Sequence, residues 1–135
     1  MKKLTLLLLL FCSMLFSSQI NWASDYQSAL DKAQKEQKPI MFVISKHECR
    51  YCIKLKSETL ADEGIIKELN SDFVPLIAHF DDGDYVPSEL FTPGVPAIWF
   101  LLPDGRPMYQ PLMGAVEIPY LKEALSIVKE SIDEY

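Results

Sequence analysis

The hydrophobic residues of this chain follow two alternating periodicities, which predict a series of helices and buried strands. A helix is expected from a cap at Ser24 or Asp25 to about Lys38. Pro39 ends it, because proline cannot continue a helix. The buried stripe of this helix has helical spacing and consists of Tyr26, Ala29, Leu30 and Ala33. Residues 40–45 are then almost all apolar, as expected for a strand that is buried on both faces.

The rest of the chain predicts further elements in the same way. In order, they are a helix over 49–60, a short helix around 65–69, strands over 73–80, 97–102 and 106–112, and a last helix after Gly114. Pro75 places its strand at a sheet edge, because proline cannot donate a hydrogen bond to a neighbouring strand. A turn at Pro103-Asp104-Gly105 joins the last two strands, which should therefore be antiparallel.

This order of elements predicts an α/β fold. The first two strands are joined through a helix, so they should be parallel with a right-handed crossover. Adding the antiparallel hairpin gives a four-stranded mixed sheet. The amphipathic helices are expected to cover both faces of that sheet.

The first 18 residues have the pattern of a secretory signal peptide. Lys2 and Lys3 precede an apolar run over 4–16, which is too short for a comfortable transmembrane helix. Small residues follow at Ser17-Ser18, so we expect cleavage near Ser18 and one mature domain over residues 19–135. The protein would then be exported, to the periplasm in a bacterium.

The charge of the mature chain limits the classes of partner that it is expected to bind. Removal of the leader, which carries two lysines and no acid, leaves 117 of the 135 residues and changes the net charge from −6 to −8. A chain this acidic is a poor candidate for binding nucleic acid or an anionic membrane surface. Its length suits one compact domain with its own core.

Two cysteines remain after the leader, in the sequence Cys49-Arg50-Tyr51-Cys52 directly after the first strand. A disulfide at this spacing closes almost no loop, so by the chain-entropy argument it adds little stability. A cysteine pair in an exported protein is normally either a structural bridge or an exchange site. The spacing therefore favours a thiol–disulfide exchange site.

Each residue of this segment has an expected role. Cys49 is predicted to be the nucleophile, because the positive end of a helix dipole lowers the pKa of a thiol placed there. Arg50 adds to this effect and Glu48 opposes it. Cys52, one turn inside the helix, would resolve the mixed disulfide between Cys49 and a substrate. Tyr51 is either a contact surface beside the sulfur or a packing residue.

The chain resembles the thioredoxin superfamily over nearly all of its mature sequence. The matching parts are the strand leading to the cysteine pair, Val95-Pro96 before the strand 97–102, the Asp104-Gly105 hairpin, and Gly114 before the last helix. The resemblance implies a thioredoxin fold. It also implies that Pro96 is cis beside the cysteines and that the Val95 backbone pairs with an extended substrate.

Within that superfamily, residues 49–56 resemble small periplasmic thioredoxin-like proteins of the SoxW type. Those relatives are taken as thiol–disulfide reductants that receive electrons from a membrane partner. The resemblance therefore implies a periplasmic reductase of protein disulfides. Its partners would be substrate proteins with disulfides or thiols and a membrane electron donor. We expect no cofactor and no nucleic acid, and a monomer, because no dimerisation domain of the kind isomerases use is present.

Three positions depart from the thioredoxin pattern. Val43 stands where cytoplasmic thioredoxins carry a buried Asp that helps to deprotonate the resolving cysteine. Glu48 stands where they carry Trp, and is either a solvated side chain or a substitute proton acceptor for Cys52. Val95 resembles the residue before proline in the periplasmic oxidant DsbA, so a thiol oxidase is an alternative function.

A metal-binding module is the alternative from another class. The pattern His47-x-Cys49-x-x-Cys52 supplies three plausible ligands for zinc or copper. A fourth could come from His79 or an acid. Against this interpretation, a second cysteine pair is missing, and a cis proline beside the sulfurs would obstruct an ion. His79 is expected to be a packed or surface residue, and the acidic run 81–84 a solvated turn.

Overall fold

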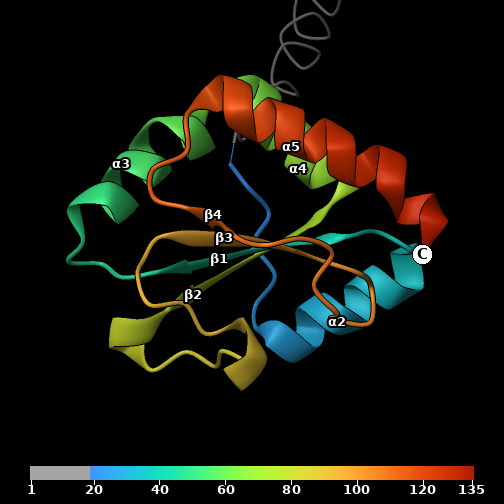
Figure 1. Ribbon diagram of the computed structural model, residues 1–135, viewed down its shortest axis with the longest axis horizontal. Helices are drawn as coiled ribbons and strands as arrows, with labels where there is room; N and C mark the ends of the chain where they lie inside the picture. Colours follow the sequence, from blue (N-terminus) through green and yellow to red (C-terminus); the bar gives the residue numbers. More distant parts are fainter. Residues whose placement is uncertain (1–18) are drawn as a thin grey trace, which may run out of the picture.

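The computed structural model describes residues 19–135, so the signal peptide predicted over 1–18 lies outside the described residues. A four-stranded sheet forms the middle layer of the structure described for these residues (Figure 1). Its strands are β1 (Ile40–Ser45), β2 (Val74–His79), β3 (Ala97–Leu101) and β4 (Leu112–Met113), in the spatial order β2-β1-β3-β4. β1 is parallel to β2 and antiparallel to β3, and β3 is antiparallel to β4. The predicted mixed sheet is confirmed.

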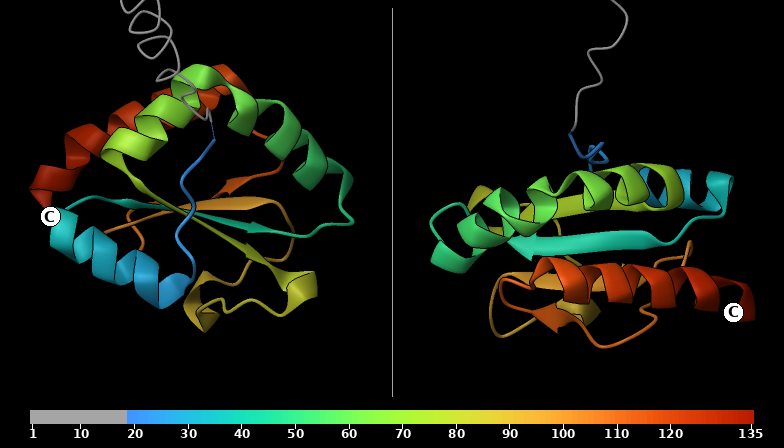
Figure 2. Two further views of the ribbon diagram at one scale, coloured as in Figure 1. Left: turned by 180° about the vertical axis from the view of Figure 1, so that it is seen from behind. Right: turned by 90° about the horizontal axis from the view of Figure 1, so that it is seen from above.

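Helices cover both faces of this sheet (Figures 1 and 2). One face carries α2 (Tyr26–Glu36), and the other carries α3 (Arg50–Ser57), α4 (Glu63–Asp72) and α5 (Ile118–Ser131). Four short 3₁₀ turns lie at Thr59–Ala61, Phe80–Asp82, Ser88–Leu90 and Ile132–Glu134. Within residues 19–135, none of the helices is both long enough and apolar enough to cross a bilayer.

The core consists of two layers separated by the sheet. All six residues of β1 are buried, which explains the continuous apolar run in its sequence. Because side chains alternate along a strand, Met41 and Val43 pack with α3, α4 and α5, whereas Ile40, Phe42 and Ile44 pack with α2. The central strand is therefore held on both faces, and its end gives rigid support to the loop and the helix that come after it.

The first helix begins as predicted and ends two residues early. The Asp25 side chain caps α2 by accepting a hydrogen bond of 2.7 Å from the Ser28 N–H. The helix ends at Glu36, and Gln37 takes a left-handed conformation with φ of 53°. Pro39 disfavours helical geometry in the residue before it, so the chain must leave the helix before Lys38.

The prediction of a strand over 106–112 was wrong in extent. Only Leu112 and Met113 form β4. Near the turn the two arms are joined by an isolated bridge between Leu101 and Pro107 and by two backbone bonds, of 2.8 Å from the Leu102 N–H to the Arg106 carbonyl and of 2.9 Å from the Met108 N–H to the Phe100 carbonyl. The segment contains Pro107 and Pro111. Since neither proline has an N–H to donate, a continuous ladder cannot form.

The topology brings three segments together at one end of the strands. β1 and β2 are in register from Ile40 opposite Val74 to Ser45 opposite His79, so their carboxyl ends lie side by side. β3 runs the other way and starts there, with Ala97 opposite Ile44. Three segments consequently meet at this end of the strands: the start of α3, the loop after β2 and the Val95-Pro96 segment. β2 is an edge strand, as the position of Pro75 predicted.

Candidate functional site

Cys49 and Cys52 form a disulfide at the N-terminus of α3, with their Cα atoms 5.1 Å apart. Cys49 is the N-cap residue of the helix, and its Sγ accepts a 3.2 Å hydrogen bond from the Cys52 N–H. Cys49 is half-buried, whereas Cys52 is only 3% exposed. The outer sulfur is thus placed for attack on another molecule, and it lies where the helix dipole and a free N–H stabilise a thiolate.

The Val95-Pro96 segment lies against this sulfur. The Val95–Pro96 peptide bond is cis, which is the configuration that the resemblance implied. The Val95 carbonyl oxygen is 3.8 Å from Cys49 Sγ, and Pro96 is buried. On its other side, the Pro96 carbonyl accepts a 2.9 Å hydrogen bond from the Gly114 N–H beside β4. Val95 is therefore fixed beside the reactive sulfur, with part of its surface open to solvent.

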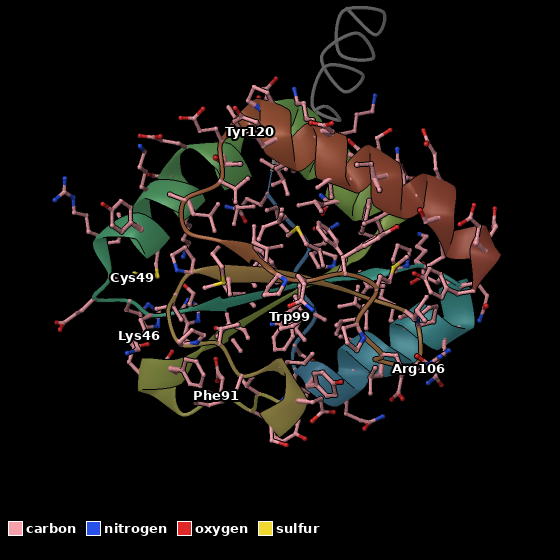
Figure 3. All side chains as sticks on the ribbon, viewed as in Figure 1. Lys46, Cys49, Phe91, Trp99, Arg106 and Tyr120 are labelled. Atoms are coloured by element: carbon pink, nitrogen blue, oxygen red, sulfur yellow. A yellow bond between two sulfur atoms is a disulfide. The ribbon has the colours of Figure 1, made fainter. Side chains whose placement is uncertain are left out.

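A groove of about 580 Å³ begins next to Val95. Its lining residues are Lys46, Glu48, Phe80, Asp81, Phe91, Thr92, Pro93, Gly94 and Val95. The ring of Phe91 is 65% exposed and packs against Phe80, with the ring centroids 5.0 Å apart. Figure 3 shows Cys49, Lys46 and Phe91 at the same end of the molecule. Sequence analysis missed Phe80 and Phe91, because only the folded loop brings them near the cysteines.

Three residues with an expected role lie on the surface around the disulfide, namely Glu48, Arg50 and Tyr51. Tyr51 is 57% exposed and projects from the first turn of α3. The Arg50 guanidinium carbon lies 5.9 Å from the centre of the Tyr51 ring, so part of the arginine charge is held over that ring. Glu48 is exposed and lines the Val95 groove. The contact role of Tyr51 fits this placement better than a packing role.

Cys52 faces a different cavity, of about 430 Å³. The residues that line it are Ser45, Lys46, His47, Cys52, Ile53, Lys56, Ser57 and His79. Glu48 is not among them, so the structure places the predicted substitute acceptor in the other groove. His79, which was expected to be a packed or surface residue and is 15% exposed, also lines the cavity of the buried sulfur.

The two histidines of the chain lie against each other in this region. The rings of His47 and His79 stack with centroids 4.0 Å apart and an angle of 7° between their planes. His47 Nε2 is 2.7 Å from a carboxylate oxygen of Asp82, and this hydrogen bond raises the pKa of His47 above its usual value. Burial and then the nearby His47 lower the pKa of His79. The pKa values of the two adjacent imidazoles are thus shifted in opposite directions.

The acidic run after β2 is exposed but makes specific contacts. Asp81 accepts a 2.7 Å hydrogen bond from the His47 N–H, and Asp84 accepts one of 2.8 Å from the His79 N–H. These bonds tie the loop to the segment that leads into α3. The prediction of a solvated turn is therefore incomplete, since its carboxylates hold both histidines in place.

A titration followed by NMR should resolve the two histidines, because the chain contains only two. His47 is expected to titrate at a higher pH than His79. Asp82→Asn should lower the pKa of His47, since the amide removes the carboxylate that stabilises the imidazolium. A matched Asp133→Asn change, in the C-terminal 3₁₀ turn, should leave it unchanged. The ring proton shifts of both residues measure this, and an unaltered His47 titration in Asp82→Asn would contradict the assigned contact.

The geometry does not favour the metal-binding module predicted as an alternative. The sulfurs of Cys49 and Cys52 are bonded to each other, so the oxidised chain has no thiolate at this position to offer. Ligand atoms of His47, His79 and Asp82 do lie within 4.8 Å of one another. However, imidazole nitrogens bind metals in the plane of the ring, and two parallel stacked rings do not direct their lone pairs to a common point.

A family model and several known proteins are similar to this chain in sequence. A family model described as thioredoxin-like matches residues 21–103. Anterior gradient protein 3 of Mus musculus is 31% identical over 85 residues, which are 57% of this chain and 52% of that protein. The chain spans about half the length of the curated relatives first matched.

Solved structures resemble the fold over most of the chain. A thioredoxin from Thermus thermophilus superposes with a TM-score of 0.70 at 23% identity, covering 84% of this chain and 89% of that one. The DsbH oxidoreductase superposes with a TM-score of 0.67 at 18% identity, covering 82% of this chain and 85% of its own. At these identities the likeness concerns the fold.

Proposed function

From the premise that the chain belongs to the thioredoxin-like family, as a disulfide oxidoreductase with a closed Cys49–Cys52 pair, we propose that it reduces protein disulfides in a bacterial periplasm. The observation that carries the proposal is the placement of Cys49. Its sulfur caps α3 and lies 3.8 Å from the carbonyl of Val95, a residue that lines an open groove. A sulfur that served only as a structural link would not need this exposure.

The reaction begins on the reduced pair. The Cys49 thiolate attacks a substrate disulfide, forming a bond to one substrate sulfur and releasing the other as a thiolate. Cys52 then attacks Cys49, which closes the disulfide within the chain and releases the second substrate thiol. The substrate gains two electrons and the cysteine pair loses two. A substrate segment in extended conformation would pair with the Val95 backbone and place a side chain in the groove of Phe80 and Phe91.

Two features support the direction of electron flow and the compartment. The segment from Cys49 to Lys56 is similar to that of SoxW-type reductants, and residues 1–18 have the pattern of an export signal. A reductant outside the cytoplasm needs a supply of electrons, so a membrane electron donor completes the proposed cycle. The substrates are proteins that carry disulfides, and the protein works as a monomer without a cofactor.

A thiol oxidase of the DsbA kind is the second candidate. The observation that favours it is Val95 before Pro96, where thioredoxins usually have Thr. The oxidase would use the same two cysteines with the electrons flowing in the opposite direction, because it would accept electrons from substrate thiols. The groove beside Val95 would serve either direction.

The reduction potential decides between the two directions. We expect a reversible two-electron couple near that of thioredoxin, about −270 mV. It is measured by equilibrating the protein in thiol buffers, alkylating the free thiols and weighing the products by mass spectrometry. A value near that of DsbA, about −120 mV, would identify an oxidant. A pair with no reversible couple would contradict the proposed function altogether.

A further inference from the structure

The buried sulfur of Cys52 has to lose a proton before it can attack Cys49. In the reduced protein Cys52 is a thiol, and its burial disfavours the thiolate. Val43 stands where, by the resemblance, thioredoxins carry a buried Asp, and it is enclosed among apolar side chains that cannot accept a proton. The proton of Cys52 therefore needs another acceptor.

His79 lies on the side of the sheet that faces Cys52. Val43 and Ile77 pack in the core layer beneath α3, and side chains two residues apart along a strand share a face. Ser45 and His79 are each two residues farther on, and they are opposite one another in register. Both line the 430 Å³ cavity that also contains Cys52. The fold thus places the side chains of His79 and Cys52 at the same cavity.

The orientation of His79 leaves one ring nitrogen available. Its Nδ1 faces a carboxylate oxygen of Asp84 at 3.8 Å, an ion-pair contact too long for a hydrogen bond, and in the tautomer with the proton on Nδ1 the lone pair of Nε2 is free to accept. The side chain is 15% exposed, so a proton that it receives can return to solvent. The neighbouring His47 ring cannot accept a proton while it is itself protonated and hydrogen-bonded to Asp82.

We propose that His79 accepts the proton of Cys52 when the mixed disulfide is resolved. This inference rests on the proposed function. In the step, Cys52 Sγ forms a bond to Cys49 Sγ, the bond from Cys49 to the substrate sulfur breaks, and that sulfur leaves with the electron pair. The proton passes from Cys52 to His79 Nε2. Atoms and electrons balance without any further reactant.

Several charged groups surround this cavity and set the pH at which His79 is neutral. They are Lys46 and His47 before α3, Lys56 on α3, and Asp81, Asp82 and Asp84 after β2. Burial and the positive His47 lower the pKa of His79 more than the acids raise it. His79 is therefore a neutral base at neutral pH and becomes protonated only in more acidic solution.

Rapid mixing of the reduced protein with the chromogenic disulfide dithiobis(nitrobenzoate) separates the two steps. Attack by Cys49 releases one coloured thiolate in a phase that depends on reagent concentration. Attack by Cys52 releases the second in a phase that does not. In wild type the second phase should slow only at a pH below the ordinary pKa of histidine, because burial and the nearby His47 lower the pKa of His79.

His79→Gln should slow the second phase about 100-fold at neutral pH and remove its dependence on histidine titration, as expected for loss of a general base. The first phase reports that Cys49 still reacts, and circular dichroism reports that the variant is folded. Glu48→Gln is the matched control, since it removes the rival acceptor in the other groove. A second phase lost in Glu48→Gln and kept in His79→Gln would overturn the proposal.

A second variant keeps the test open if His79→Gln does not fold. His47→Gln removes the positive neighbour of His79, so the inflection of the second phase should move to higher pH. An inflection that stays in place would contradict the role of His79. A wild-type protein that releases no second thiolate at any pH would instead refute the proposed function, and the two failures are thus distinguishable.

Discussion

Cys52→Ser is expected to accumulate a covalent complex with its substrate, whereas Cys49→Ser should form none and lose all turnover. Cys49 is the half-exposed sulfur at the helix N-terminus, and Cys52 is buried behind it. Without Cys52, the mixed disulfide on Cys49 has no neighbouring thiol to displace it. Insulin reduction measures turnover, and non-reducing gels with mass spectrometry detect the complexes. Both variants should fall to the uncatalysed rate of insulin reduction.

The pattern of trapped complexes is the informative part of this experiment. The double variant, with serine at both positions, is the control for adducts through any other group. Complexes that form in Cys49→Ser but not in Cys52→Ser would reverse the assigned roles. Equal trapping in both would mean that either sulfur reaches the substrate, contrary to the difference in their exposure.

Phe42→Ala should lower the free energy of unfolding by about 3–5 kcal/mol. Phe42 is 0% exposed at the centre of β1, and its ring packs 5.9 Å from that of Tyr26 on α2. Removing the ring leaves a cavity beneath the strand that leads to the cysteine pair. Urea unfolding of the oxidised protein, followed by circular dichroism, measures the change. A loss this large is a substantial part of the stability of a typical small domain.

Phe91→Ala is the matched control, because it makes the same chemical change at a 65% exposed site. Its effect on unfolding should stay within about 1 kcal/mol, as is usual for surface positions. Equal losses in the two variants would contradict the distinction between the core of β1 and the rim of the groove.

Local sequence was sufficient for the elements that rest on periodicity and on single residues. β1 was predicted with both of its ends, because its five apolar residues, 40–44, are bounded by Pro39 on one side and by Ser45 and Lys46 on the other. The edge position of β2 followed from Pro75 alone. The prediction of a strand over 106–112 was wrong in extent, because it rested on the apolar residues of this segment and took no account of Pro107 and Pro111.

The cysteine pair could be predicted because its chemistry is encoded in adjacent residues. Cys49 and Cys52 are one helical turn apart, so any helix that begins at Cys49 brings the two sulfurs together. The resemblance to thioredoxins added Val95 and Pro96, which no local argument connects to residues 49–52. The Val95 carbonyl oxygen lies 3.8 Å from Cys49 Sγ, and this placement depends on β3 starting where β1 ends.

The sequence by itself determined a mixed α/β sheet with an exchange-competent cysteine pair at the end of its central strand. Only the tertiary structure decided which groups surround each sulfur. Glu48, adjacent to Cys49 in sequence, lies in the groove of Val95, whereas His79, 27 positions beyond Cys52, shares its cavity. The physical reason is the parallel pairing of β1 with β2. It aligns strand ends that are far apart along the chain, and no local pattern records that register.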